Sequence, residues 1–109
     1  MPNLQAEESH AKAVERLLHD RDFGHLRARK HGATIIVESG PKDDAFKHLR
    51  LTRVGVHIWL LHMADHRGRW EPTPFRGALD ELVTAVAETF PWTLQDVHGH
   101  SERTSDRKY

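Results

Sequence analysis

The chain has 109 residues, 38% of them hydrophobic and 29% charged, which is typical of a single soluble domain with a modest hydrophobic core. Its 16 basic and 16 acidic side chains give a formal net charge of zero. The absence of cysteine excludes disulfides, thiolate metal sites and cysteine nucleophiles, and the absence of any run of about 18 apolar residues excludes a membrane-spanning helix.

The first predicted element is an amphipathic helix over residues 4–19, where apolar residues recur at helical spacing. Asn3 is the predicted N-cap, and Glu7 and Glu8 suit the positive end of the helix dipole. The apolar stripe of this helix comprises Ala6, Ala13, Val14, Leu17 and Leu18.

Short stretches of alternating or β-branched residues follow, separated by glycine and polar turn residues, and they predict an antiparallel sheet. The predicted strands span residues 25–30, 33–39, 48–53, 56–64 and 69–71. Pro72 and Pro74 are expected to end the last of them. Alternation directs one set of apolar side chains toward the core, namely Leu26, Ala28, Leu49 and Leu51.

The clearest helical pattern lies in residues 78–90 and is closed by Pro91. Its apolar stripe comprises Leu79, Leu82, Val83, Val86 and Phe90. Beyond this helix, Trp92 and Leu94 are expected to fold back onto the sheet.

The order of these elements predicts an α+β domain in residues 1–97. An N-terminal and a C-terminal helix would cover one face of an antiparallel sheet of three to five strands, and the other face would meet solvent. Residues 98–109 are polar, and we expect them to form a disordered tail.

The middle of the chain is basic, since residues 21–77 hold eleven Lys and Arg against six Asp and Glu. On the solvent face of the sheet, alternation gathers Arg27, Arg29, Arg50 and Trp59, with His57 as a further member. A basic face that carries an aromatic ring suits phosphate contact and base stacking. We therefore predict a small non-enzymatic module that binds nucleic acid or a protein partner through this face.

A homodimer is an open alternative for the partner. The segments that flank the basic middle are acidic, so the two kinds of surface are complementary in charge. Three tryptophans are also many for so small a core, and tryptophan is favoured at interfaces.

The stretch HMADHRGRWEPTPFRG, residues 62–77, combines apolar and basic side chains between a strand and a helix. We interpret Gly68 as a turn residue and Trp70 as a core anchor, with two prolines that stiffen the crossing. Phe75 would hold this crossing against the second helix.

The same stretch supplies an alternative function, a small metal-independent ribonuclease of the toxin kind. Such an enzyme needs a general base, a proton donor and cations that stabilise the charge of the transition state. The candidate residues are His62, His66, Arg67 and Arg69, with Arg76 nearby and with His62 or His66 as the base. Spacing alone does not distinguish this set from a solvated turn.

Metal binding is not favoured, although the chain has ten histidines. Strand alternation separates His57 from His62, and only His62, His66 and Asp65 lie close enough in sequence to converge. The HExxH and deaminase motifs are absent. We therefore expect no metal and no cofactor.

The motifs GRWEPTPFRG, LDELV and FPWTL, which fall between Leu49 and Leu94, resemble a group of short proteins of actinobacteria-like bacteria to which no activity is assigned. The resemblance implies a bacterial cytoplasmic setting and no site residues. The N-terminal residues lack the basic and apolar regions of a secretory signal, which agrees with that expectation.

The helix–sheet–helix order also resembles that of double-stranded-RNA-binding domains and of small RNA-cleaving toxins, at the level of the fold only. The double-stranded-RNA-binding family has a basic stretch at the start of its second helix. Here that position holds Asp80 and Glu81, which argues against membership.

Overall fold

The computed structural model describes residues 4–65 and 67–95, and within them it shows the predicted α+β architecture. The helices are α1 (Glu8–His19) and α2 (Leu79–Thr89), with 3-10 turns η1 (Lys42–Asp44) and η2 (Pro91–Leu94). The strands are β1 (Arg27–His31), β2 (Thr34–Ser39), β3 (Phe46–Arg53), β4 (Trp59–Ala64) and β5 (Trp70–Gly77). The predicted tail, residues 98–109, lies outside the described residues.

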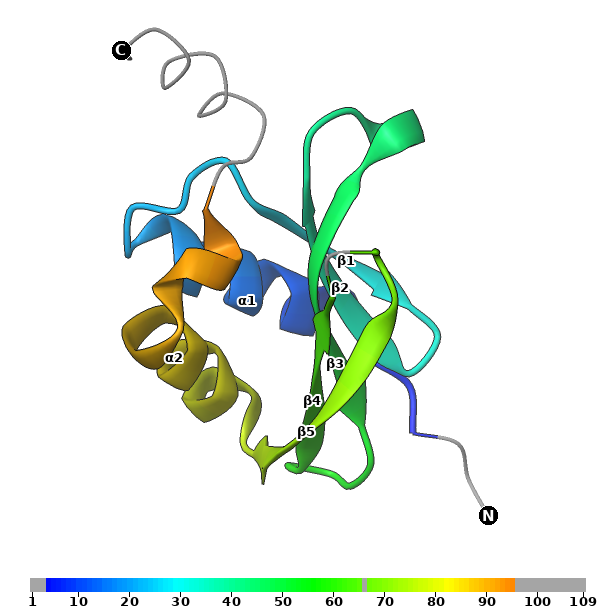
Figure 1. The fold of residues 1–109 in the computed structure, drawn as a ribbon. Helices are drawn as coiled ribbons and strands as arrows, with labels where there is room; N and C mark the ends of the chain where they lie inside the picture. The colour runs from blue at the N-terminus through cyan, green and yellow to red at the C-terminus, as the bar shows by residue number, and fades with distance from the viewer. Residues whose placement is uncertain (1–3, 66, 96–109) are drawn as a thin grey trace, which may run out of the picture.

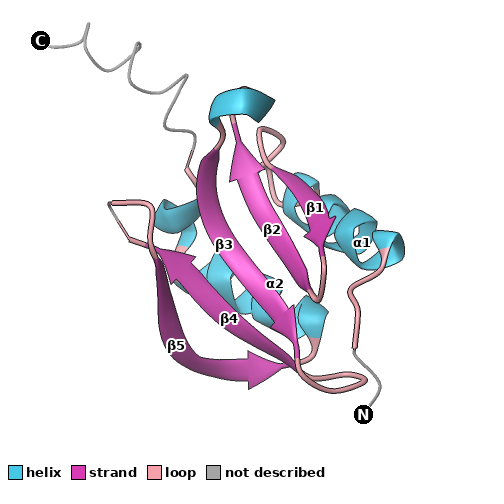
Figure 2. Cartoon of the chain, turned by 90° about the vertical axis from the view of Figure 1, so that its right-hand side faces the viewer, coloured by secondary structure: helices cyan, strands magenta, loops and turns pink. Residues whose placement is uncertain are grey.

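The five strands form one antiparallel sheet in the order β1-β2-β3-β4-β5, so each strand pairs with its neighbours in sequence. Both helices pack on the same face of this sheet (Figure 1). No described element covers the opposite face, which is turned toward the viewer in Figure 2. We call this opposite side the uncovered face.

The hydrophobic core lies between the sheet and the helices. The sheet contributes the buried side chains of Ile35, Val37, Leu49, Leu51, Trp59 and Leu61. The helices and η2 contribute Val14, Leu18, Leu82, Val83, Val86 and Leu94. The stripe predicted for α2 is confirmed, whereas in α1 the buried alanine is Ala11 and the predicted Ala13 is exposed.

The first turn of α1 is fixed by a local hydrogen bond. The predicted N-cap, Asn3, lies outside the described residues, and the helix begins at Glu8. The backbone N–H of Glu7 donates to Nδ1 of His10 at 3.0 Å, which satisfies a donor that the helix itself leaves without a partner. The His10 ring also packs edge-on against Trp59, with ring centroids 5.0 Å apart.

The C-terminal end of α1 has the hydrogen bonds of a Schellman motif. The N–H of Phe23 donates to the carbonyl of Leu18 at 3.0 Å, and the N–H of Asp22 donates to that of His19 at 3.2 Å. Asp22 has a φ of 71°, in the left-handed region that this motif requires. Phe23 packs against the hydrophobic core to which Leu18 belongs, as expected of the apolar residue that follows such an end.

The strand predicted over residues 56–64 begins only at Trp59. The preceding residues form the turn between β3 and β4, in which the N–H groups of Val54 and Gly55 both donate to the carbonyl of Ile58, at 2.9 and 3.1 Å. The carbonyl of Ile58 is therefore used to close the hairpin.

The prediction that Pro72 and Pro74 end the last strand is wrong, since β5 runs through both of them to Gly77. Proline is tolerated because β5 lies at the edge of the sheet, where a missing N–H can face solvent. The register also shifts between Leu60 and His62, and there the Thr73 hydroxyl donates to the Leu61 carbonyl at 2.8 Å. A side-chain hydrogen bond thus supports the ladder at the irregularity.

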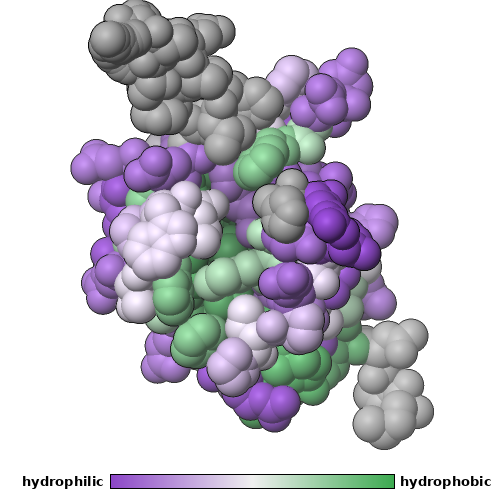
Figure 3. Space-filling model, viewed as in Figure 1, coloured by the Kyte–Doolittle hydropathy of each residue, from purple (hydrophilic) through white to green (hydrophobic). Residues whose placement is uncertain are grey.

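Phe75 contacts the end of α2, as predicted. Its ring centroid lies 5.9 Å from that of Phe90. Between β5 and α2 is a small apolar cleft of about 80 Å³, lined by Leu61, Phe75, Leu82, Ala85, Val86, Thr89 and Phe90. Figure 3 shows apolar surface on this side of the molecule, bordered by hydrophilic side chains.

Two histidines hold η2 against the sheet. Nε2 of His25 donates to the Leu94 carbonyl at 2.6 Å, and Nδ1 of His48 donates to the Thr93 carbonyl at 2.8 Å. Leu94 is buried, as expected for a residue that folds back onto the sheet, whereas Trp92 is 63% exposed and departs from that prediction. The tight η2 turn directs these two side chains to different sides.

Replacement of Asp22 by glycine is expected to raise the free energy of unfolding by about 0.5 kcal/mol, because glycine adopts a left-handed φ without steric cost. Urea denaturation monitored by circular dichroism measures the change. Gly32→Ala, at a φ of 61° in the β1–β2 turn, is the control and is expected to destabilise by about 1 kcal/mol. A lower stability of Asp22→Gly would contradict the assignment.

Unfolding of the protein is expected to become easier as the pH falls below about 6.5, partly through His10. Burial and, second, the Arg53 charge lower the pKa of His10 from its ordinary 6.5. The unfolded chain therefore binds this proton first as the pH falls, and stability decreases between the unfolded and the folded pKa.

The variant His10→Gln keeps an acceptor for the Glu7 N–H and cannot titrate, so its melting temperature is expected to fall less than that of the wild type between about pH 7.5 and 5.5. His10→Ala is the control, because it loses the acceptor and should melt lower at every pH. Equal pH profiles for the glutamine variant and the wild type would sink this role for His10.

Candidate functional site

The uncovered face carries most of the basic side chains of the sheet. Arg27 and Arg29 of β1 lie on it with Arg50 of β3, as predicted, because their neighbours along each strand point into the core. Cross-strand pairing continues one row over four strands, which comprises Arg29, Ile36, Arg50 and His62. The pairing also places Lys47 beside Glu38, and Arg76 beside Leu60.

The prediction that Trp59 belongs to the uncovered face is wrong. Trp59 is 2% exposed and belongs to the core, where it packs against His10. Alternation had paired Trp59 with Leu61 correctly, but both point toward the helices, so it is Leu60 and His62 that face outward. His57, which was grouped with Trp59, lies exposed in the turn before β4.

The aromatic ring on the uncovered face is Trp70, which was predicted to be a core anchor. Trp70 is not among the buried core residues, and it pairs in register with Ala64, which shares a face with His62. Cζ of Arg50 lies 5.2 Å from the centre of the Trp70 ring, a cation–π contact. Trp70 was assigned to the core because the strand was predicted to end at Pro72. In the full strand β5, which continues past both prolines, alternation places Trp70 outward.

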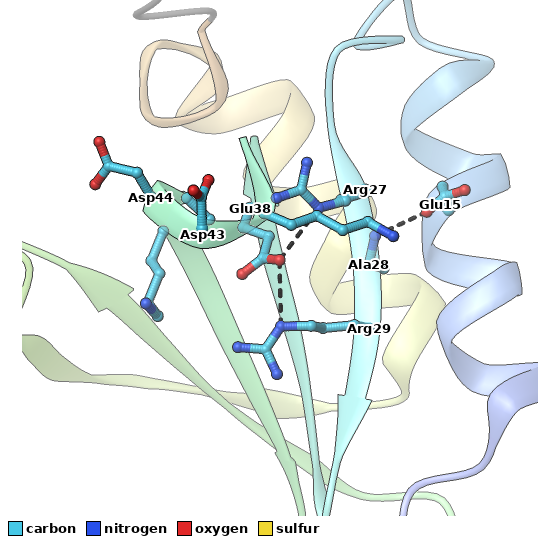
Figure 4. A pocket seen from close by; sticks show the side chains of 10 residues that line it. Glu15, Arg27, Ala28, Arg29, Glu38, Asp43 and Asp44 are labelled. Carbon is cyan, nitrogen blue, oxygen red and sulfur yellow. Dashed lines mark hydrogen bonds and ion pairs between the residues drawn. The ribbon is translucent and has the colours of Figure 1, made fainter. Parts of the chain in front are cut away.

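Arg27 and Arg29 are joined by a buried acid. Nε of each arginine contacts the same oxygen of Glu38, at 3.1 and 3.2 Å, and the Glu38 side chain is only 5% exposed (Figure 4). Arg27 also donates from Nη1 to the Gly40 carbonyl. These two arginines therefore have structural partners, and the buried Glu38 carboxylate is neutralised by them.

This ion-pair cluster forms the floor of an open pocket of about 690 Å³. Its charged lining is balanced, with four basic and four acidic side chains, namely Arg27, Arg29, Lys42, Lys47, Glu15, Glu38, Asp43 and Asp44. One of the acids closes the edge of the sheet, since Glu15 of α1 accepts a hydrogen bond from the Ala28 N–H at 2.8 Å. With this balance the pocket itself has no net preference for an anion.

Arg50 and His62 differ from that cluster, because neither has a carboxylate partner among residues 4–65 and 67–95. In the same part of the chain, Nε of Arg50 and Nδ1 of His62 are both buried and lack a hydrogen-bond partner. Burial and, second, the neighbouring Arg50 charge lower the pKa of His62, so its imidazole is neutral at pH 7.

The turn from Asp65 to Arg69 is ordered by the Asp65 carboxylate. Its Oδ1 accepts the backbone N–H groups of Arg67 and Arg69, each at 2.8 Å, and Gly68 adopts a φ of 80°. The Arg69 side chain is 69% exposed, with its Nε 3.8 Å from Oδ2 of Asp65. Of the proposed ribonuclease set, His62 thus faces Arg50 on the sheet, Arg67 and Arg69 lie in the turn, and His66 lies outside the described residues.

No metal centre is built into the described segments, which contain no group of three or more histidine, aspartate or glutamate side chains able to hold an ion. His98 and His100 lie outside those segments. No helix in them is long and apolar enough to cross a membrane.

Comparison with known proteins identifies no relative. No family model matches the chain, and no curated protein or solved structure does so. The geometry of the uncovered face is therefore the guide to what this protein binds.

The two tryptophans are expected to differ sharply in their contribution to stability. Trp59→Ala should lower the free energy of unfolding by about 3–5 kcal/mol, because it empties a core position. Trp70→Ala should cost about 1 kcal/mol or less, since its ring lies on the uncovered face. Urea denaturation monitored by circular dichroism measures both, and Trp59→Phe provides a milder variant should the alanine variant fail to fold. Similar costs at the two positions would contradict the assignment.

Proposed function

We propose that this domain binds single-stranded nucleic acid through the uncovered face of its sheet and that it is not an enzyme. The observation that carries the proposal is Arg50, whose guanidinium lies against Trp70 and has no carboxylate partner in the described part of the chain. A cation without a counter-ion beside an aromatic ring is the combination that a phosphate and an unstacked base require.

The charge of the whole face supports the same proposal. Its basic side chains are Arg27, Arg29, Lys47, Arg50 and Arg76. Glu38 is the acid on this face among the described strand residues, and it is buried between Arg27 and Arg29. The terminal amino groups of Arg29, which is paired with Glu38 through Nε and whose side chain is 43% exposed, are still available to phosphate oxygens. Those of Arg27 are not, since Nη1 donates to the Gly40 carbonyl and Nη2 is buried. The face therefore attracts a polyanion although the chain as a whole is neutral.

A single strand fits better than a duplex. Bases offer their faces for stacking only when they are unpaired, so an aromatic and guanidinium platform selects unpaired strands. The first turn of α2 carries Asp80 and Glu81, which would repel the phosphates of a duplex that approached this helix.

A metal-independent ribonuclease is the second candidate. The observation in its favour is the neutral imidazole of His62 beside Arg50, since a neutral histidine can accept a proton and an arginine can stabilise a developing phosphate charge.

For either function we propose a bacterial cytoplasmic setting, which is supported by the absence of cysteine.

Binding is expected to weaken about tenfold at low salt in the variant Arg50→Ala, because it removes one phosphate contact and the stacking partner of Trp70. The probe is a labelled 15-nucleotide oligouridylate, titrated with the protein at several salt concentrations. The slope of log affinity against log salt should become shallower by about 0.7. Arg16→Ala removes an exposed arginine from α1 on the covered side and is the matched control, with affinity expected to stay within about twofold.

A second variant tests whether removal of a negative charge from the uncovered face raises the affinity for the oligonucleotide. Glu38→Gln removes the negative charge and keeps an acceptor for Arg27 and Arg29, so affinity should rise about threefold at low salt. If the wild type does not bind at low salt, the proposal fails and a protein partner becomes the answer. Cleavage of the probe by the wild type, lost in His62→Ala while binding persists, would establish the ribonuclease.

A further inference from the structure

In the described part of the chain, three buried nitrogen atoms on the uncovered face lack hydrogen-bond partners, namely Nη2 of Arg27, Nε of Arg50 and Nδ1 of His62. The last two belong to neighbouring residues. Arg50 of β3 and His62 of β4 are directly opposite each other in the strand register. Side chains of such a pair start with Cβ atoms about 4.5–5.5 Å apart on the same face. Among the described residues, Nε of Arg50 and Nδ1 of His62 are both without a partner.

The partner that each nitrogen lacks has the same chemistry. Nε of Arg50 is a permanent donor and requires an acceptor. Nδ1 of His62 is a donor once the ring is protonated, and it then requires an acceptor too. A single oxyanion with several oxygen atoms satisfies both, provided that His62 is protonated when the anion is bound.

Among the groups around His62, Arg50 is the one whose charge affects its protonation. From β3 it faces Arg50, and from β5 its register partner is Pro72, with Trp70 further along the same side of the strand. On its own strand, Leu60 and Ala64 share its face. The helices pack on the other side of the sheet (Figure 1). The next charge along the face is Arg76 of β5, which pairs with Leu60. The charge that acts on the pKa of His62 is the Arg50 guanidinium.

We infer that Arg50 and His62 together form the phosphate seat of the uncovered face, and that His62 takes up a proton when the phosphate binds. This inference rests on the proposed function, because it names the residues that hold the phosphate and the proton that accompanies it. Neither nitrogen is exposed in the free protein, so the Arg50 side chain has to change rotamer to admit the anion.

The consequence for binding follows from proton linkage. In the free protein, burial and the Arg50 charge both oppose protonation of His62 and lower its pKa. A bound anion offsets the Arg50 charge and adds its own attraction, so the pKa of His62 rises in the complex. Affinity for the anion therefore increases as the pH falls through the interval between the free and bound pKa, by up to about tenfold per pH unit.

The test measures affinity for a 15-nucleotide oligouridylate at pH values of about 8, 7, 6 and 5.5 and constant ionic strength. Uracil has no basic nitrogen in this range, so the probe itself does not titrate. Wild-type affinity is expected to rise about tenfold across the series, while His62→Gln should show a much smaller rise. His57→Gln, which changes an exposed histidine outside the seat, is the matched control and is expected to keep the wild-type rise.

Calorimetry measures proton uptake on binding, which a general attraction by positive charge does not change. Titration in two buffers with different heats of ionisation gives the number of protons taken up on binding. Near pH 6 the wild type should take up a larger fraction of a proton than His62→Gln does. An equal uptake in both, or an equal rise of affinity, would overturn the role of His62 and would leave the proposed binding function intact.

Sulfate provides a test of the seat without nucleic acid. It stays a dianion over this pH range, and its addition should raise the midpoint of the His62 ring signals in an NMR titration of the wild type but not of Arg50→Gln. If the oligonucleotide fails to bind and sulfate still shifts the midpoint, the seat stands and the nucleic-acid function fails. If sulfate leaves the midpoint unchanged, the seat itself is overturned.

Discussion

The architecture depends on the burial of one face of a five-stranded meander by two helices. Strand residues alternate between faces, so burial of Leu49 and Leu51 forces Arg50 between them to the opposite surface. The same coupling in β4 turns His62 outward because Leu61 is buried. The chemistry of the uncovered face is therefore fixed by the rigid sheet that the core stabilises, and not by a loop that must be ordered separately.

The alternation of residues along a strand predicted which residues share a face. It failed to predict which of the two faces is buried against the helices. In β4, Trp59 and Leu61 lie on one face, and Leu60 and His62 lie on the other. Alternation alone allows either face to be the buried one. The choice depends on the partner strand, since Leu61 pairs with Leu51 of β3, which is already in the core. That pairing is a tertiary fact, so the periodicity of one segment does not contain it.

The remaining departures share this cause. Two prolines end a strand by local rules, but β5 tolerates them because it has a neighbour on one side only, and that position is known from the sheet as a whole. Likewise, Arg27 and Arg29 read as free cations in sequence, whereas register places Glu38 opposite Arg27 and within reach of Arg29. Cross-strand pairing, and not composition, separates the two arginines that share a carboxylate from Arg50, which has none in the described part of the chain.

The meander also determines how the chain can fold as it is made. Every strand pairs with its neighbour in sequence, so each hairpin can form from a short length of chain. Closure of the core depends on residues far apart in sequence. The hydrogen bonds of His25 and His48 to the carbonyls of Leu94 and Thr93 can form only after η2 has been made. During synthesis on the ribosome, the sheet therefore presents its apolar side until η2 has emerged. In that interval it is most exposed to aggregation and to chaperones that recognise apolar strands.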